Sequence, residues 1–130
     1  MSNSKYQLLM AEFTEIATGR ELKISESETV TCKFKHEDCI IEDGARISCD
    51  NAIVIMIELQ DRSLKADLLG LNGHFDVTAD GYIAKLQSGK YYYIRIVYNI
   101  EHPLFLLSKM NESVEIVTNI KKYVDKYVVD

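Results

Sequence analysis

The chain has 130 residues, of which 47% are hydrophobic and 27% are charged, and its formal net charge is -5. This length predicts a single domain over residues 1–130, and the apolar content excludes a largely disordered chain. The 20 acidic residues outnumber the 15 Lys and Arg residues, which argues against a nucleic-acid partner because such partners need a clustered basic surface.

Membrane-spanning and export segments are not expected. The longest uninterrupted apolar stretch, residues 52–57, is far shorter than the ~20 residues that cross a bilayer. The apolar run near the start is interrupted by Glu12, so it lacks the pattern of a secretory signal. We therefore interpret Cys32, Cys39 and Cys49 as reduced thiols in a cytosolic protein, and their spacing lacks the CxxC pattern of zinc sites.

The first predicted element is a helix from about residue 5 to residue 18. Ser4 opens a capping box at its start. Four apolar residues at helical spacing form one stripe: Tyr6, Leu9, Phe13 and Ile16. Leu8 and Met10 lie off this stripe, so the helix carries more apolar surface than one core face requires.

Strands are predicted next. Residues 29–35 alternate strictly, with Val30, Cys32 and Phe34 on one face, which is typical of a half-buried strand. A second short strand is expected at residues 39–41, after a polar turn.

The region that follows leads to the centre of the predicted sheet. Residues 46–49 are expected to extend or begin a strand, which leaves an extra hairpin within residues 38–51 open. Residues 53–59 are β-branched and nearly all apolar, so they predict a central strand that is buried on both faces.

The second half predicts a short helix, a hairpin and a long helix. Leucines at helical spacing indicate a helix within residues 64–71. A turn at Ser88 and Gly89 joins strands at residues 82–86 and 91–98. The final helix opens at Pro103 and runs for about 23 residues with apolar residues three and four apart. The predicted order is therefore α-β-β-β-α-β-β-α, an α+β fold with an antiparallel sheet.

Catalytic and metal-binding constellations are not found. The histidines, His36, His74 and His102, all fall in predicted turns or element ends. His36 with Cys39 would be a base and a nucleophile, but an exposed turn histidine beside a strand cysteine is the favoured interpretation. His74 with Asp76 lacks a third metal ligand at suggestive spacing. We expect no catalytic residue, no cofactor and no metal site.

Apolar surface exceeds what one layer of helices requires. Two amphipathic helices would cover one side of a five-stranded sheet and leave its other face without a partner. This favours a homodimer or a protein-binding module over a monomer whose loops close that face. The alternative class is a small α+β enzyme or ligand-binding protein with a polar pocket that holds at least two of the histidines.

The order of elements resembles the class I effector chaperones of bacterial type III secretion systems, the group that includes the Tir chaperone. Residues 8–16 look like the opening helix of that family, with a Leu-Leu pair followed by phenylalanine. Residues 64–71 occupy the place of its Leu-rich dimer helix. Residues 81–98 and the closing helix look like its last two strands and C-terminal helix.

This resemblance implies a cytoplasmic bacterial homodimer with a twisted antiparallel sheet and flanking helices. It implies a non-enzymatic chaperone that holds an N-terminal segment of an effector extended, soluble and competent for secretion. The export ATPase of the secretion system is a further implied partner, whereas this chain has no nucleotide-binding motif of its own. A regulatory module of the same fold that sequesters another protein is a third hypothesis.

Periodicity and the resemblance together assign candidate contact residues. Dimer contacts are expected at Leu64, Leu68, Leu71 and Tyr92. Client contacts are expected at Leu8, Met10, Val30, Cys32 and Phe34. Each of these residues can instead belong to the core, and for Phe34 the core is the favoured assignment.

Overall fold

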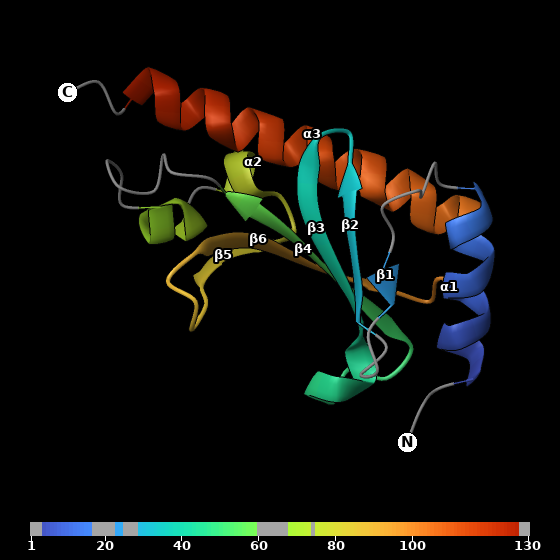
Figure 1. Cartoon of the computed structure of the whole chain (residues 1–130). Helices are drawn as coiled ribbons and strands as arrows, with labels where there is room; N and C mark the ends of the chain where they lie inside the picture. The colour runs from blue at the N-terminus through green and yellow to red at the C-terminus, as the bar shows by residue number, and fades with distance from the viewer. Residues whose placement is uncertain (1–3, 17–22, 25–28, 60–67, 74, 128–130) are drawn as a thin grey trace.

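The computed structural model describes residues 4–16, 23–24, 29–59, 68–73 and 75–127 (Figure 1). Its elements follow one another in the order α1 (Ser4–Ile16), β1 (Lys23–Ile24), β2 (Val30–Phe34), β3 (Glu37–Asp43), the 3-10 helix η1 (Gly44–Ile47), β4 (Ala52–Leu59), the 3-10 helix η3 (Leu68–Gly73), α2 (Phe75–Thr78), β5 (Tyr82–Lys85), β6 (Tyr91–Tyr98) and α3 (Pro103–Tyr127). This architecture confirms the predicted α+β fold with an antiparallel sheet.

The described strands form one six-stranded sheet in the order β1-β2-β3-β4-β6-β5. Every neighbouring pair is antiparallel. The central strand β4 lies between β3 and β6, and its residues are buried except for Glu58, which is half-buried. A strand that is covered on both faces has a nearly continuous apolar sequence. The prediction that residues 53–59 form a central strand buried on both faces is therefore confirmed.

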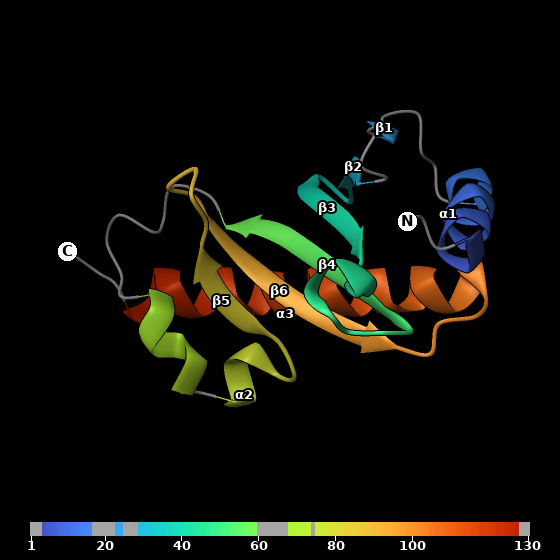
Figure 2. The same cartoon turned by 90° about the horizontal axis from the view of Figure 1, so that it is seen from below.

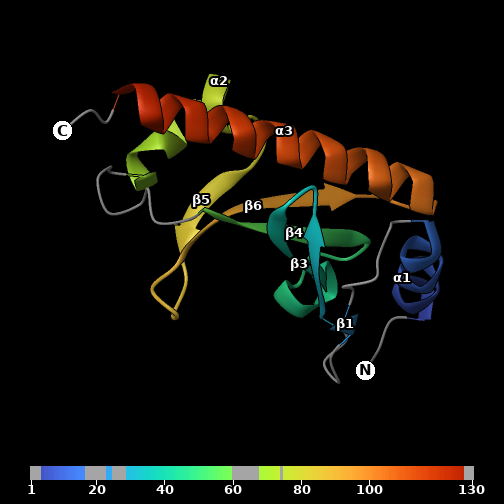
Figure 3. The same ribbon diagram turned by 45° about the horizontal axis from the view of Figure 1, so that its top comes forward.

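Two helices pack on one face of the sheet. The long helix α3 crosses this face, and α1 lies beside the first turns of α3 (Figures 1 and 3). Their apolar stripes meet the inward side chains of the sheet in one core cluster. The largest fully buried members are Tyr93, Phe13, Met10, Ile41, Ile55, Ile57, Ile83, Leu106, Met110 and Ile120.

The hairpins follow their turn chemistry. Lys35 and His36 both have positive φ angles, 50° and 72°, which is the conformation of a two-residue turn that matches the twist of paired strands. Gly89 has a φ of 86° in the turn between β5 and β6, as the Ser-Gly signal predicts. The two hairpins therefore form where the sequence places them.

Three expectations need correction. Residues 46–49 do not form a strand, because Asp43 accepts a hydrogen bond from the Ala45 amide at 3.0 Å and caps the 3-10 helix η1. Ile16 is 40% exposed and does not join the buried stripe of α1. The two-residue strand β1, which extends the sheet beyond five strands, was not predicted.

No helix in the described part of the chain is long and apolar enough to cross a bilayer.

Candidate functional site

The sheet has a second apolar face, on the side away from α3. Figure 2 views β4, β5 and β6 with α3 behind them. A separate cluster of buried side chains lies there, and we call it the distal face: Val54, Met56, Tyr92 and Ile94, with Ile40, Ala84, Leu86 and Ile96 half-buried against them.

Strand alternation and register explain this cluster. Met56 of β4 pairs with Ile40 of β3 and with Ile94 of β6, and residues directly opposite across an antiparallel pair point to the same face. Tyr92 pairs with Ala84 in the same way. Because successive residues of a strand alternate between faces, β4 and β6 supply apolar side chains to both the core and the distal face.

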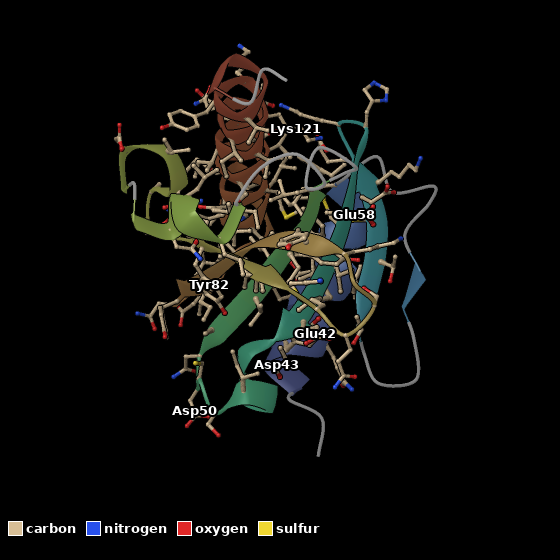
Figure 4. The ribbon with its side chains drawn as sticks, turned by 90° about the vertical axis from the view of Figure 1, so that its left-hand side faces the viewer. Glu42, Asp43, Asp50, Glu58, Tyr82 and Lys121 are labelled. Atoms are coloured by element: carbon tan, nitrogen blue, oxygen red, sulfur yellow. The ribbon has the colours of Figure 1, made fainter. Side chains whose placement is uncertain are left out.

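The edge of the distal face is partly exposed and polar. Tyr82 is 42% exposed and Tyr98 is 56% exposed, and both lie on this face by their position in β5 and β6. Tyr82 and Lys121, which lies on the α3 side, are on opposite sides of the sheet in Figure 4. Lys90 pairs with Glu58 at 3.4 Å beside the apolar centre. An apolar centre within a polar, aromatic border is the composition of a protein interface.

Burial at the distal face changes the chemistry of one tyrosine. The pKa of Tyr92 is raised above its ordinary value, first because burial disfavours the phenolate and then because the Glu58 carboxylate lies nearby. The phenol therefore remains neutral in the physiological range and contributes apolar surface with a polar tip.

One edge of the sheet is closed by a side chain. The Asn72 side-chain amide nitrogen donates to the Ile83 carbonyl at 2.9 Å, and the Ile83 amide donates to the Asn72 side-chain oxygen at 2.6 Å. A neighbouring strand would make the same two bonds to this outer edge of β5. Asn72 therefore holds η3 against the edge strand and occupies its hydrogen-bonding groups at that position.

A buried cation connects the core side of the sheet to α3. The Arg95 side chain is 7% exposed, and its Nε donates to Asp80 Oδ1 at 2.7 Å. Its other guanidinium nitrogens donate to Glu112 at 3.1 Å and to the Ser113 hydroxyl at 3.3 Å. Arg95 holds the pKa of Asp80 below its usual value through this hydrogen bond. The charge is satisfied within the fold, so this cluster joins β6, α3 and the turn before β5.

The residues predicted for dimer contacts are only partly brought together. Leu64 lies outside the described residues, and for Leu68 the structure describes the backbone of η3. Leu71 is buried in the core cluster, whereas Tyr92 is buried in the distal face. Of the helix predicted over residues 64–71, the structure describes residues 68–71, which belong to the 3-10 helix η3. The short helix α2 lies beyond the predicted range.

The residues predicted for client contacts divide by burial. Leu8 is 63% exposed on α1. Phe34 is half-buried at the end of β2 and packs against the core cluster, as the favoured core assignment expects. Met10, Val30 and Cys32 are buried in the core cluster, so for them the structure takes the core alternative. Apolar exposure that the sequence did not assign occurs at Leu104 and Phe105, at the start of α3.

The histidines do not converge where the structure describes them. His36 is exposed in the turn between β2 and β3, and His102 is exposed before α3, where its Nδ1 accepts from the Leu104 amide at 3.1 Å. His74 lies outside the described residues. The described residues contain no group of three or more His, Cys, Asp and Glu side chains arranged to hold a metal ion.

A small pocket lies between α1 and the end of the sheet. Its lining includes Tyr6 and Leu9 from α1, Asp43 from the end of β3, and Asn51 and Asn99 from two turns. Some of its polar groups already have hydrogen-bond partners within the fold. Asp43 caps η1, and the Asn99 backbone amide donates to the Asn51 backbone carbonyl at 2.8 Å. It contains neither of the two described histidines.

An uncovered second face of the sheet was expected from the sequence, but the full set of residues that form it was not, and Asn72 was not found. The distal face extends the predicted Tyr92 face to β3, β4 and β5, and the signal for it was the apolar residue at alternate positions of β4. Asn72 gave no local signal, because its partner Ile83 becomes a neighbour only after the chain folds.

Comparison with solved structures identifies the fold. A chain of the HopA1–SchA chaperone–effector complex matches with a TM-score of 0.64 at 15% identity, over 91% of this chain and 94% of that chain. The structure of the Yersinia pestis type III secretion chaperone SycH in complex with a stable fragment of YscM2 contains a chain that matches with a TM-score of 0.60 at 11% identity, over 88% of this chain and 98% of that one. No protein-family model and no curated protein sequence matches. The chain therefore has the α+β fold found in structures of type III secretion chaperones.

Proposed function

We propose that the chain is a non-enzymatic type III secretion chaperone that works as a cytoplasmic homodimer and holds an effector segment in an extended form. The observation that carries this proposal is the shared fold, which covers about nine-tenths of the chain and of its counterparts in the two complexes. Both of those structures contain a chaperone bound to another protein. The match therefore favours a chaperone function for this chain.

The distal face is the surface we assign to a second copy of the chain. Its central side chains already pack against one another in the single chain, so the surface open to a partner comes from the half-buried residues around them and from the exposed Tyr82 and Tyr98. Tyrosine suits interfaces because it offers a large apolar ring with a polar tip. Tyr92, predicted as a dimer contact, lies at the centre of this face. Leu71 faces the core, so in this proposal it supports η3 from beneath.

The effector segment needs a different surface. The β5 edge is closed at Ile83 by Asn72, which directs strand addition to the β1–β2 end of the sheet. The half-buried Phe34 lies at that end. The exposed Leu8 on α1 supplies a further apolar contact, so an extended client would lie along β2 and continue onto α1.

Light scattering tests the homodimer. The wild-type chain is expected to show a mass near twice its 14.9 kDa at micromolar concentration. Tyr82→Glu and Tyr98→Glu each place a carboxylate at the proposed interface and should weaken the dimer by tenfold or more, since a buried unpaired charge costs well over 1.4 kcal/mol. Gln87→Glu, in the exposed turn of the same hairpin, is the matched control and should leave the dimer intact. A wild-type chain that is monomeric would reject this part of the proposal.

Client capture tests the chaperone function. A secreted protein encoded beside this gene would be co-produced with the chain, and protease protection of its N-terminal segment would be mapped. The expected result is a protected segment that has no compact structure of its own. Leu8→Glu should reduce capture by at least tenfold, whereas Glu15→Gln on the same helix should not. Binding to a folded domain, or protection that Leu8→Glu leaves unchanged, would contradict the assignment.

A further inference from the structure

Two of the three cysteines lie directly opposite each other in neighbouring strands. Cys32 of β2 pairs with Cys39 of β3, and both side chains belong to the core cluster. The exposed fraction is 4% for Cys32 and 0% for Cys39. Residues directly opposite across an antiparallel pair point to the same face, so the two thiols lie side by side in the core of the reduced protein.

The strand register suits a covalent link between them. The two-residue turn at Lys35 and His36 is closed by the pair Phe34 and Glu37, which makes that pair hydrogen-bonded in this hairpin type. Pairs alternate along an antiparallel ladder, so Cys32 and Cys39, two positions further on, form a hydrogen-bonded pair with a Cα separation of about 5.5 Å. This value lies within the Cα range of about 4.4–6.8 Å that disulfides bridge. The Cβ atoms of a hydrogen-bonded pair are about 5.5 Å apart, which exceeds the about 3.5–4.5 Å of a relaxed disulfide, so the link is strained and readily reduced, as a reversible modification requires.

The two thiols are chemically unequal. The pKa of Cys32 is lowered, because its sulfur accepts the hydrogen bond from Cys39. The pKa of Cys39 is raised well above its ordinary value by that same bond, by burial and by the nearby Glu37 carboxylate. The Cys39 thiol also lies 3.5 Å from the Glu37 carbonyl oxygen, to which it can donate. An attacking sulfur and a resolving sulfur are thus distinguished within one pair.

Access to this pair is through the end of the sheet. The described pairing of β2 with β1 involves only Thr31 and Val30, so Cys32 lies beyond the strand pairing on that side. A hairpin near the end of a sheet opens locally at lower free energy than the centre. Both side chains face the core, so oxidation requires such a local opening of the β2–β3 hairpin but not global unfolding.

We propose that Cys32 and Cys39 are a redox modification site that forms a reversible intramolecular disulfide with hydrogen peroxide as the oxidant. The Cys32 thiolate attacks one peroxide oxygen, the O–O bond breaks, and hydroxide leaves to yield a sulfenic acid. The Cys39 sulfur then attacks Cys32 Sγ and expels the hydroxyl group. The two thiols together lose two protons and two electrons, and the peroxide takes them up to become two water molecules. A dithiol reductant reverses the link by thiol exchange.

The test uses the full chain without a client, so its outcome is independent of the chaperone proposal. The reduced protein is exposed to equimolar hydrogen peroxide, alkylated, digested and analysed by mass spectrometry. The expected product has lost about 2 Da, the mass of two hydrogen atoms, and its fragments join Cys32 to Cys39 while Cys49 is alkylated. Dithiothreitol should restore the starting mass.

Single variants separate this pair from general oxidation. Cys49→Ser should oxidise like the wild type. Cys39→Ser should trap a sulfenic acid at Cys32 that reacts with dimedone, and Cys32→Ser should form no intramolecular link. Oxidation should shift the melting temperature of the wild type and of Cys49→Ser by the same amount and leave that of Cys32→Ser unchanged; the shift should stay below the roughly 9 °C that closing a short loop would give, because the strained link offsets part of the gain. A product linked through Cys49, or oxidation only to sulfinic and sulfonic acids, would overturn the proposal.

Discussion

Gly81→Ala tests how tightly β5 approaches the core. A Cβ atom at position 81 would lie 2.4 Å from the ring carbon and the hydroxyl oxygen of Tyr93 and 2.7 Å from the backbone carbonyl of Ile94. Tyr93 cannot swing away freely, because it is fully buried and its hydroxyl donates to the Thr78 carbonyl at 2.7 Å. To admit the added methyl group, the backbone of β6 and the Tyr93 ring must therefore shift together.

The expected cost follows from overpacking. Forcing an extra methyl group into a close-packed site costs about 1–3 kcal/mol, less about 0.4–1 kcal/mol because alanine restricts the unfolded chain. Near its melting temperature, a chain of this length loses about 0.27 kcal/mol of unfolding free energy for each degree of heating. Near the middle of these ranges the net loss is about 1.3 kcal/mol, so Gly81→Ala should lower the melting temperature by roughly 5 °C. Gly73→Ala is the control, since a Cβ there meets nothing within 4 Å.

A double-mutant cycle identifies the cause of the loss. Tyr93→Phe removes the hydroxyl from the clash, while the Thr78 carbonyl keeps its bond from the Gly81 amide at 3.1 Å. The double variant should therefore be more stable than the sum of the single changes predicts, by about 0.5–1.5 kcal/mol. Thermal unfolding followed by circular dichroism measures all four proteins. A melting temperature for Gly81→Ala within 1 °C of the wild type, or additive single changes, would refute the steric explanation.

Three further predictions concern polar groups. Asn72→Ala should cost about 1–3 kcal/mol and speed hydrogen exchange at the Ile83 amide, whereas the exposed Asn119→Ala should change neither. Because Arg95 lowers the pKa of Asp80, the stabilisation from Asp80 is complete above its unfolded pKa and is lost as the pH falls through the folded value. The stability gap between wild type and Asp80→Asn, measured by urea unfolding, should therefore narrow in acid. Burial raises the pKa of Tyr93 to about 12 from 10.0, so the wild type should lose stability between those pH values, and Tyr93→Phe should show a smaller loss, since Tyr92 with its raised pKa remains.

Elements with strong local patterns could be predicted from the sequence. The alternation of β2, the apolar run of β4 and the helical repeat of α3 each identify an element from residues close together in the chain. The turns at Gly89 and before Pro103 also act locally. These elements fix the α+β class, because alternating strands and two amphipathic helices have few compact arrangements.

The remaining features depend on contacts between distant residues. Gly44 allows η1 to pack closely, since a Cβ there would lie 2.6 Å from the Cys49 carbonyl, and a strand-like run at residues 46–49 cannot reveal that constraint. Strand β1 is too short to leave a pattern. On α1, Met10 stands four residues after Tyr6 and three before Phe13, so a face wider than the predicted stripe places it in the core and leaves Leu8 outside. On β2, the same alternating residues fit a core or a client contact, and only the packed helices decide between them.

The position of α3 also determines when the protein can fold during its synthesis. The central strand β4 pairs on one side with β3, which precedes it, and on the other with β6, which is made about 40 residues later. The core then needs α3, which contributes six buried apolar side chains: Leu106, Met110, Val114, Val117, Ile120 and Val124. A nascent chain can close the β2–β3 hairpin early, because its contacts are local. It can complete its core only after α3 leaves the ribosome, so until then the inner face of the sheet is exposed to other proteins in the cell.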